Sequence, residues 1–385
     1  MKKKQNGFDL AKVSLLTVAH FFHDVYTAFL APLIPYLQSS MGINLTFAGV
    51  LSVVQRLPTL LNPFVGMLAE RTKARYFVIF TPAITAISMS LVSVAPHKVY
   101  MVLLVLISGI SSSFFHVPSP VMMRKVSGKR IGMGMSFYMM GGELARSVGP
   151  IAVIGAIELW GLKGVTYFIP TGILASTLLY FKLRNIAISD SLSSSTSLEY
   201  IKVFRKFLPL ISTIAFILFF RAAMKSALTF YLPVFLESRG ESIWFAGISL
   251  SVLQGAGVVG TFLAGTISDK IGRRSMMVIT SVATPILFFT FLYTTGVVQM
   301  IVLVLCGLFL FATGPVFLAI VNEYKTEHNN FVNAVFMTTT FLIGALMVLL
   351  VGILGDLLSL ETTYRIVGFM AFLSIPFAFR IPKKA

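Results

Sequence analysis

The sequence has a single cysteine and few charged residues. Cys306 is the only cysteine among 385 residues, which excludes a disulfide within the chain and any metal cluster held by several cysteines. Charged side chains make up 12% of the chain and hydrophobic ones 56%, and the mean hydropathy is +0.88. A soluble globule of this size needs more polar surface than this composition provides. The sequence therefore predicts that lipid surrounds most of the chain.

Motifs of common hydrolases and of nucleotide-dependent enzymes are also missing from the sequence. The chain contains no H-E-x-x-H zinc motif, no G-x-S-x-G nucleophile turn and no G-x-x-x-x-G-K-[ST] phosphate loop. We therefore expect no enzymatic activity, no metal site and no cofactor. Since the sequence shows no ATP site, an ion gradient, most simply of protons, is the expected source of energy.

Apolar stretches recur along the chain between charged or Pro- and Gly-containing breaks. Most of them are close to the ~20 residues that a helix needs to cross a hydrocarbon core of ~30 Å. About twelve segments of this kind are predicted. Their approximate ranges are 10–38, 44–69, 76–95, 99–123, 131–156, 162–183, 207–236, 243–268, 275–295, 297–321, 330–355 and 362–381.

The positive charges are sorted by side of the membrane. The formal net charge is +17, and 23 of the 31 Lys and Arg residues lie in the tails and in the loops on one side. The loops on the other side hold only Lys98, Lys163, Arg239 and Arg365. Because cytoplasmic loops carry the excess of Lys and Arg, both termini are predicted in the cytoplasm, with the protein integral to the cytoplasmic (inner) membrane. The net charge thus reflects topology, and no nucleic acid partner is expected.

One short loop pattern occurs twice, with its copies 199 residues apart. The first copy is GMLAERTKAR, from Gly66 to Arg75, and the second is GTISDKIGRR, from Gly265 to Arg274. Each copy follows one long apolar segment and precedes another, which indicates a duplicated protein. We predict an all-α membrane protein of two pseudo-symmetric six-helix bundles, at 1–183 and 207–385, joined by a Ser-rich cytoplasmic linker at 184–206.

The acidic residue of each loop is a candidate for a conformational latch. An acid at the end of one helix can pair with a base on a neighbouring helix or cap a helix N-terminus, and so hold one conformation until substrate releases it. For the basic residues, keeping the loop in the cytoplasm is the alternative role. The candidate latch residues are Gly66, Glu70, Arg71, Arg75, Gly265, Asp269, Lys270, Gly272, Arg273 and Arg274.

Ionisable side chains inside the apolar segments are the main functional candidates, because a charge in the membrane must be paired or hydrated. These residues are His20, His23, Asp24, Arg56, His116, Glu143, Arg146, Arg221 and Lys225. His20, His23 and Asp24 are spaced to share one helix face, and Glu143 and Arg146 lie one turn apart. We predict a proton-coupling role for Asp24, Glu143, His20 and His23. Packing for the histidines and a structural ion pair for Glu143 with Arg146 are the alternatives.

The intramembrane charges include more cations than carboxylates, which predicts a site that attracts anions. Arg221 and Lys225 lie four residues apart and repel each other unless an anion lies between them. A guanidinium from Arg56 or Arg146 can hold phosphate-like oxygens in a fork. The predicted substrate-binding residues are Arg56, His116, Arg146, Arg221 and Lys225. The expected partner is a small or amphipathic anion with a phosphate, phosphonate or carboxylate head, in a surrounding of membrane lipid.

Three stretches of the N-terminal half show a resemblance to a known family. They are AHFFHDVYTAFLAPLIPYL at 19–37, NPFVGMLAERT at 62–72 and FFHVPSPVMMRKVSGKRIGMGMSFYMMGGELARSVGP at 114–150. They resemble the fosmidomycin-resistance family of the major facilitator superfamily, whose loop motif the repeated pattern also resembles. The positions matching the family pattern are Phe115, His116, Ser127, Gly128, Gly141, Gly142, Gly149 and Pro150, with Val117 in place of the usual proline.

The resemblance implies a drug:proton antiporter, most simply a monomer. In such a protein two six-helix bundles rock around a central cavity and give alternating access to substrate. A flippase of lysophospholipid or glycolipid anions on the same fold is one alternative, and a membrane receptor that does not transport is another. The repeated loop with Asp269, Gly272 and Arg273 favours a protein that still changes conformation over a receptor.

Overall fold

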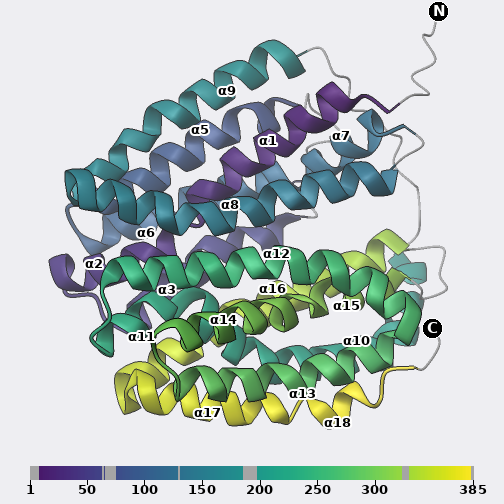
Figure 1. Ribbon diagram of the computed structural model, residues 1–385. Coiled ribbons are helices and arrows are strands. Elements are labelled where there is room, and N and C mark those ends of the chain that lie inside the picture. Colours follow the sequence, from purple (N-terminus) through teal and green to yellow (C-terminus); the bar gives the residue numbers. More distant parts are fainter. Residues whose placement is uncertain are drawn as a thin grey trace, which may run out of the picture. The chain divides into compact units, whose positions relative to one another are not determined.

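The computed structural model describes residues 8–62, 65, 75–128, 131–184, 197–322 and 329–382 (Figure 1). Within these ranges the chain forms helices and no strand. The predicted all-α membrane fold class is therefore confirmed.

Nine helical spans among the described residues are long and apolar enough to cross a membrane. They are Leu10–Met41, Arg75–Val94, Lys98–Pro120, Leu162–Leu183, Ile201–Ser238, Ile243–Ala264, Arg273–Leu292, Gly296–Val321 and Val335–Leu358. Each of these spans overlaps one of the predicted segments. The other three predicted segments contain α3 (Leu45–Arg56), α8 (Ile131–Trp160) and α17 (Leu360–Phe372), which are not among the nine.

The chain divides into two compact units. The first unit comprises Met1–Gly42 and Val54–Leu192, and the second comprises Ile43–Val53 and Ser193–Ala385. The predicted bundle boundaries at 183 and 207 remain predictions, and residues 197–206 of the predicted linker form the start of a helix. Helix α3 contributes to both units, because the unit boundary falls within it.

Each unit contains about ten helical elements within the described residues. The first unit contains α8 and the last residues of α3, together with α1 (Leu10–Thr27), α2 (Leu30–Met41), η1 (Leu57–Leu61), α5 (Arg75–Leu91), η2 (Val92–Val94), α6 (Lys98–His116), α7 (Pro118–Val126), η3 (Leu162–Phe168) and α9 (Ile169–Leu183). The second unit contains α17 and the first residues of α3, together with α10 (Ser197–Ser226), η4 (Ala227–Tyr231), α11 (Leu232–Ser238), α12 (Ile243–Ile271), α13 (Arg273–Leu292), α14 (Gly296–Phe311), α15 (Thr313–Asn322), α16 (Asn329–Leu358) and α18 (Ile375–Ala378).

Glycines allow α1 and α8 of the first unit to pack in direct contact. A Cβ atom added to Gly141 would lie 2.4 Å from the Thr17 carbonyl oxygen, and one added to Gly142 would lie 2.6 Å from the His20 ring. Small residues at a helix crossing let the two backbones approach closely. The Gly-Gly pair therefore brings the polar side chains of α8 within reach of those on α1.

A proline break ends α6 next to one of the predicted site residues. Helix α6 ends at His116 and α7 begins at Pro118, which occupies the start of the new helix. Proline has no backbone N–H, so the helical hydrogen bond to the preceding turn is missing at this point. The break leaves His116 at a helix end, where its ring lies among side chains of α1 and α8.

In the second unit, a carboxylate caps the first turn of α3. Asp356 of α16 accepts hydrogen bonds from the backbone N–H groups of Leu45 (2.9 Å) and Thr46 (2.7 Å). The hydroxyl of Tyr231 lies 3.1 Å from the Leu45 carbonyl oxygen and 2.9 Å from that of Val348. Because the first N–H groups of a helix lack partners within it, the Asp356 carboxylate stabilises the start of α3.

Replacing Gly352 by alanine is expected to lower the free energy of unfolding by about 1–3 kcal/mol, the usual cost of overpacking. Its Cβ atom would lie 2.4 Å from the Leu45 carbonyl oxygen and 2.5 Å from the Tyr231 hydroxyl. Thermal unfolding of the purified protein in detergent measures the change. Gly314→Ala is the control, because a Cβ atom there meets nothing within 4 Å. Equal stability of the two variants would contradict the close packing of α3 on α16.

Candidate functional site

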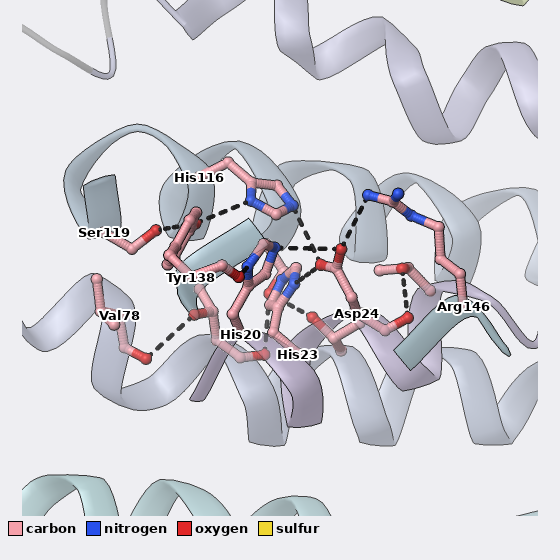
Figure 2. Close-up of polar contacts among 12 residues, drawn as sticks. His20, His23, Asp24, Val78, His116, Ser119, Tyr138 and Arg146 are labelled. Atoms are coloured by element: carbon pink, nitrogen blue, oxygen red, sulfur yellow. Dashed lines mark hydrogen bonds and ion pairs between the residues drawn. The ribbon is translucent and has the colours of Figure 1, made fainter. Parts of the chain in front are cut away.

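A buried carboxylate on α1 is the centre of a polar cluster in the first unit (Figure 2). Asp24 is 2% exposed, and its two oxygens contact four basic side chains from three helices. The contact distances are 3.3 Å to His20 Nε2, 3.0 Å to His23 Nδ1, 3.2 Å to His116 Nε2 and 3.4 Å to an Arg146 terminal nitrogen. Glu143 also belongs to the cluster, because it is the ion-pair partner of Arg146. The cluster therefore contains six ionisable side chains.

The α1 members of the cluster lie on one helix face, as the sequence spacing predicts. His20 and Asp24 are one turn apart, and both side chains are almost fully buried. The ring of His23 stacks on Phe115 of α6, with ring centroids 4.3 Å apart and planes 10° apart. Packing and polar contact therefore occur together at His23, so the two predicted roles do not exclude each other.

Helix α8 contributes an ion pair that extends the cluster. One terminal nitrogen of Arg146 lies 2.5 Å from Glu143 Oε1, and the other lies 3.4 Å from Asp24 Oδ2. The guanidinium therefore bridges two carboxylates, one on its own helix and one on α1. Glu143 Oε2 is buried and has no hydrogen-bond partner among the described residues. This oxygen is free to accept a further donor.

Two residues of the cluster carried no signal in the sequence. Tyr138 of α8 contacts both His20 and His116, and its hydroxyl lies 2.6 Å from the Ser119 hydroxyl of α7. Tyrosine and serine occur often in apolar helices as packing residues, so neither residue type is a marker of function. Only the packing of α7 and α8 places these hydroxyls beside the histidines.

Arg56 lies at the end of α3, on the portion that belongs to the first unit. Within the described part of the chain, its guanidinium forms no hydrogen bond and no ion pair, and its main electrostatic neighbour is Arg146. Two guanidinium groups that repel each other in a low-dielectric surrounding favour an anion between or beside them. The structure therefore leaves Arg56 available for a ligand.

Arg221 and Lys225 have separate partners in the second unit. The Arg221 guanidinium is buried and donates to the carbonyl oxygen of Thr280 (2.8 Å) and the hydroxyl of Thr284 (3.2 Å), both on α13. Lys225 is exposed, and its ammonium group lies 4.8 Å from the centre of the Phe311 ring. The structure does not bring the two cations together at one anion, although the sequence spacing suggested it.

The predicted latch residues of the second loop pair within that loop. Asp269 at the end of α12 forms an ion pair with Arg273 at the start of α13, at 2.5 Å. Gly272, with a φ of +90°, makes the turn between the helices, and such a positive φ favours glycine. The Arg274 guanidinium lies over the Phe379 ring. The exposed Lys270 and the backbone of Gly265 lie on α12.

The first copy of the loop is described only at its end. Gly66, Glu70 and Arg71 lie outside the described residues. Arg75 begins α5, and its guanidinium lies over the Tyr76 ring at 5.3 Å from the ring centre. A latch role for either copy therefore stays a prediction.

Three residues of the cluster have the types and the spacing of metal ligands. His20, Asp24 and His116 each place one potential ligand atom within 4.8 Å of the others. The guanidinium of Arg146 lies 3.4 Å from the same carboxylate and would repel a divalent ion. The charge pattern therefore disfavours a divalent metal ion at these three residues.

Comparison with known proteins places the chain among membrane transporters. The model of the Major Facilitator Superfamily matches residues 16–347. The fosmidomycin resistance protein of Escherichia coli (strain K12) is 26% identical over 372 residues, which cover 94% of this chain and 90% of that protein. The uncharacterized MFS-type transporter YfnC of Bacillus subtilis (strain 168) is 22% identical over 377 residues, covering 96% and 92% of the two chains.

Solved structures show the same fold at low sequence identity. A D-xylose–proton symporter aligns with a TM-score of 0.78 at 13% identity, covering 98% of this chain and 99% of that one. A bacterial homolog of the human lysosomal transporter Spinster, in an inward-facing and unoccupied conformation, aligns with a TM-score of 0.75 at 16% identity, covering 99% and 98% of the two chains. These alignments extend over both units of the chain.

Proposed function

The chain belongs to the major facilitator superfamily of membrane transporters, and from this premise we propose that it exchanges protons for small or amphipathic anions by alternating access. The proposed direction is export across the cytoplasmic membrane, with both termini in the cytoplasm. The proton gradient supplies the energy, and neither a cofactor nor a second subunit takes part.

The observation that carries this proposal is the Asp24 cluster. A carboxylate that is buried in a membrane-spanning helix is costly unless it is paired or hydrated, and such groups commonly belong to proton relays. Three histidine rings contact Asp24, each with a nitrogen between 3.0 and 3.3 Å from a carboxylate oxygen. Histidine is the side chain best suited to exchange protons near neutral pH. The cluster therefore supports proton coupling.

The anionic nature of the substrate is proposed from the guanidinium groups. Arg56 has no hydrogen-bond or ion-pair partner in the described part of the chain, and it lies close enough to Arg146 for repulsion. Planar guanidinium groups bind phosphate, phosphonate and carboxylate oxygens in pairs. We assign the anionic head of the substrate to Arg56 and Arg146.

Arg146 connects anion binding with proton binding in the proposed function. Its guanidinium contacts the Asp24 carboxylate and the Glu143 carboxylate. An anion that binds Arg146 competes with both carboxylates for the same donor, so anion occupancy and proton occupancy depend on each other. This linkage is the physical basis of coupling in the proposal.

Export is proposed partly from the relative found by sequence. The Escherichia coli protein is named for resistance to fosmidomycin. Resistance to a compound is consistent with its removal from the cell. We therefore propose export for this chain, with phosphonates as the first class of substrate to test.

The test of the proposal is proton movement in proteoliposomes of the purified protein with a pH dye inside. Phosphonates, carboxylates and anionic amphiphiles are added outside, and protein-free liposomes are the control. Exchange predicts that the lumen becomes more alkaline as the anion enters and protons leave. Acidification of the lumen would contradict exchange and indicate symport. No response to any compound, together with thermal stabilisation by lipid-like anions, would favour a flippase or a receptor.

A further inference from the structure

The two ring nitrogens of His20 face two different oxygen atoms. Nδ1 lies 2.7 Å from the backbone carbonyl oxygen of Tyr138, on α8. A carbonyl oxygen only accepts hydrogen bonds, so Nδ1 must carry the hydrogen of this contact. The neutral ring has one N–H, and it is therefore on the side of Tyr138.

The other nitrogen of His20 then has no hydrogen to offer. Nε2 lies 3.3 Å from Asp24 Oδ2, and the two side chains are 4% and 3% exposed. Apart from this contact, His20 Nε2 has no partner among the described residues. A neutral ring would place a lone pair against the lone pairs of a carboxylate in a buried site, which is unfavourable. One additional proton between the two groups removes the conflict.

We propose that His20 and Asp24 share one exchangeable proton, and that Tyr138 is the positioning residue that directs it there. The inference rests on the proposed function and deepens it, because it names the pair that holds the coupling proton. The proton resides on His20 Nε2 or on Asp24 Oδ2, and in either place it makes the 3.3 Å contact between the two groups attractive (Figure 2). Release of this proton leaves two acceptors face to face.

Tyr138 holds His20 by two features. Its carbonyl oxygen accepts from Nδ1, and its ring stacks on the imidazole with centroids 4.0 Å apart and planes 19° apart. Its hydroxyl lies 3.5 Å from Nδ1 of the neighbouring His116. The carbonyl is part of the α8 backbone. A shift of α8 against α1 breaks the bond to Nδ1 and frees the ring to change tautomer. Movement of this helix therefore controls whether the shared proton stays.

His23 differs from His20 because it needs only one hydrogen. Its Nδ1 lies 3.0 Å from Asp24 Oδ1, and its Nε2 is buried without a partner among the described residues. The ring stacks on Phe115 and faces no second acceptor. A neutral His23 with hydrogen on Nδ1 satisfies its contact with Asp24. We assign it the role of a permanent donor.

The remaining groups that face the pair set its electrostatic surroundings. His116 of α6 is the most exposed of the three rings, at 36%, and its Nδ1 faces a hydroxyl that can donate or accept. A neutral His116 with its hydrogen on Nε2, which lies 3.2 Å from Asp24 Oδ1, therefore satisfies both contacts. The full set of charged or titratable neighbours is His23 on α1, His116 on α6, Tyr138, Glu143 and Arg146 on α8, and Arg56 through its proximity to Arg146.

Nitrogen-15 NMR of histidine-labelled full-length protein in lipid nanodiscs tests the inference without any substrate. The His20 signals are assigned by their loss in His20→Gln. The expected result at neutral pH is a hydrogen on Nδ1 and a hydrogen-bonded Nε2. In Asp24→Asn the signal of Nε2 should shift, while the hydrogen on Nδ1 stays with the Tyr138 carbonyl. A His20 ring with an unprotonated Nδ1, or an Nε2 free of any hydrogen bond, would overturn the proposal.

A matched pair of histidine substitutions tests the role of the shared proton in transport. His20→Gln keeps an amide donor near Asp24 but cannot release a proton. His97→Asn is the control, because His97 is exposed and only caps α6, where asparagine is also a good cap. We expect His20→Gln to bind the anion and to move no protons, and His97→Asn to couple as the wild type does. Coupling in His20→Gln, or an equal loss in both variants, would refute the assignment.

A second pair on α8 tests the positioning by that helix. A Cβ atom on Gly142 would lie 2.7 Å from His20 Nε2 and 3.2 Å from Asp24 Oδ2, whereas one on Gly141 would meet the Thr17 backbone. Both alanine variants disturb the packing of α1 on α8. Only Gly142→Ala should alter the His20 NMR signals and the pH dependence of transport. If Gly141→Ala altered the His20 signals and the pH dependence in the same way, disturbed helix packing alone would explain both changes.

The outcomes separate this inference from the proposed function. If wild-type protein moves no protons with any anion, the proposed function fails, while the NMR experiment still decides whether His20 and Asp24 share a proton. If the wild type couples and His20→Gln couples equally, the proposed function stands and the inference fails.

Discussion

Asp24→Asn is expected to abolish proton-driven transport and to leave the fold intact. Asparagine has nearly the volume of aspartate, and its amide can still contact the histidine rings around position 24. It neither ionises nor binds a transferable proton. Because Asp24 is the group that all three histidines and Arg146 contact, no other carboxylate of the cluster can replace it. Substrate-induced pH change in proteoliposomes measures the loss.

Asp9→Asn is the matched control for this variant. Asp9 precedes α1 and pairs with Lys12 at 2.6 Å, near the surface and away from the cluster. Asparagine is also a good residue at a helix N-terminus, so the helix start is preserved. The control should transport as the wild type does. Proton movement in Asp24→Asn at the wild-type rate would remove Asp24 from the coupling mechanism.

Arg56→Gln is expected to weaken binding of the anionic substrate by about 10- to 100-fold. A hydrogen bond to a charged group contributes about 1.5–3 kcal/mol, and each 1.4 kcal/mol corresponds to about tenfold in affinity. The Arg56 guanidinium has no hydrogen bond or ion pair within the described residues, so its removal breaks no polar contact there. Calorimetric titration of the purified protein with a phosphonate that responds in the proteoliposome assay measures the affinity.

The control for this variant is Arg365→Gln. Arg365 is exposed and pairs with Glu361 on α17, so its removal changes the net charge by the same amount without touching the cluster. Equal affinity in wild type and Arg56→Gln would exclude Arg56 from the binding site. Equal weakening in both variants would show that the effect comes from overall charge alone. Arg146 is a less selective target, because its guanidinium also contacts Asp24 and Glu143.

Contacts within one helix could be predicted from the sequence because helix geometry relates spacing to position. His20 and Asp24 are four residues apart and pair at 3.3 Å, and Glu143 and Arg146 are three apart and pair at 2.5 Å. The same reasoning was incomplete for Arg221 and Lys225. Their spacing is helical, but a neighbouring helix supplies hydrogen bonds to Arg221 that the spacing does not reveal.

Contacts between helices could not be predicted from a single sequence. His116 joins Asp24 from a distance of 92 positions along the chain, and the Tyr138 carbonyl joins His20 from a distance of 118. Which faces of α1, α6 and α8 meet depends on side-chain packing, on the break before Pro118 and on the close approach at Gly141 and Gly142. A regular spacing within any one helix contains none of this information.

From the sequence alone an all-helical membrane protein can be predicted, with a duplicated loop motif and a set of charges in its apolar segments. Those features depend on composition, on segment length and on local spacing, which the bilayer and helix geometry translate directly into structure. Helix packing, in contrast, makes Asp24 the centre of the cluster, places the Tyr138 carbonyl on His20, and leaves Arg56 without a hydrogen bond or ion pair in the described residues. Hydrogen bonds between helices depend on the rotation and approach of the helices to within a few tenths of an ångström, and close packing across the whole unit sets both.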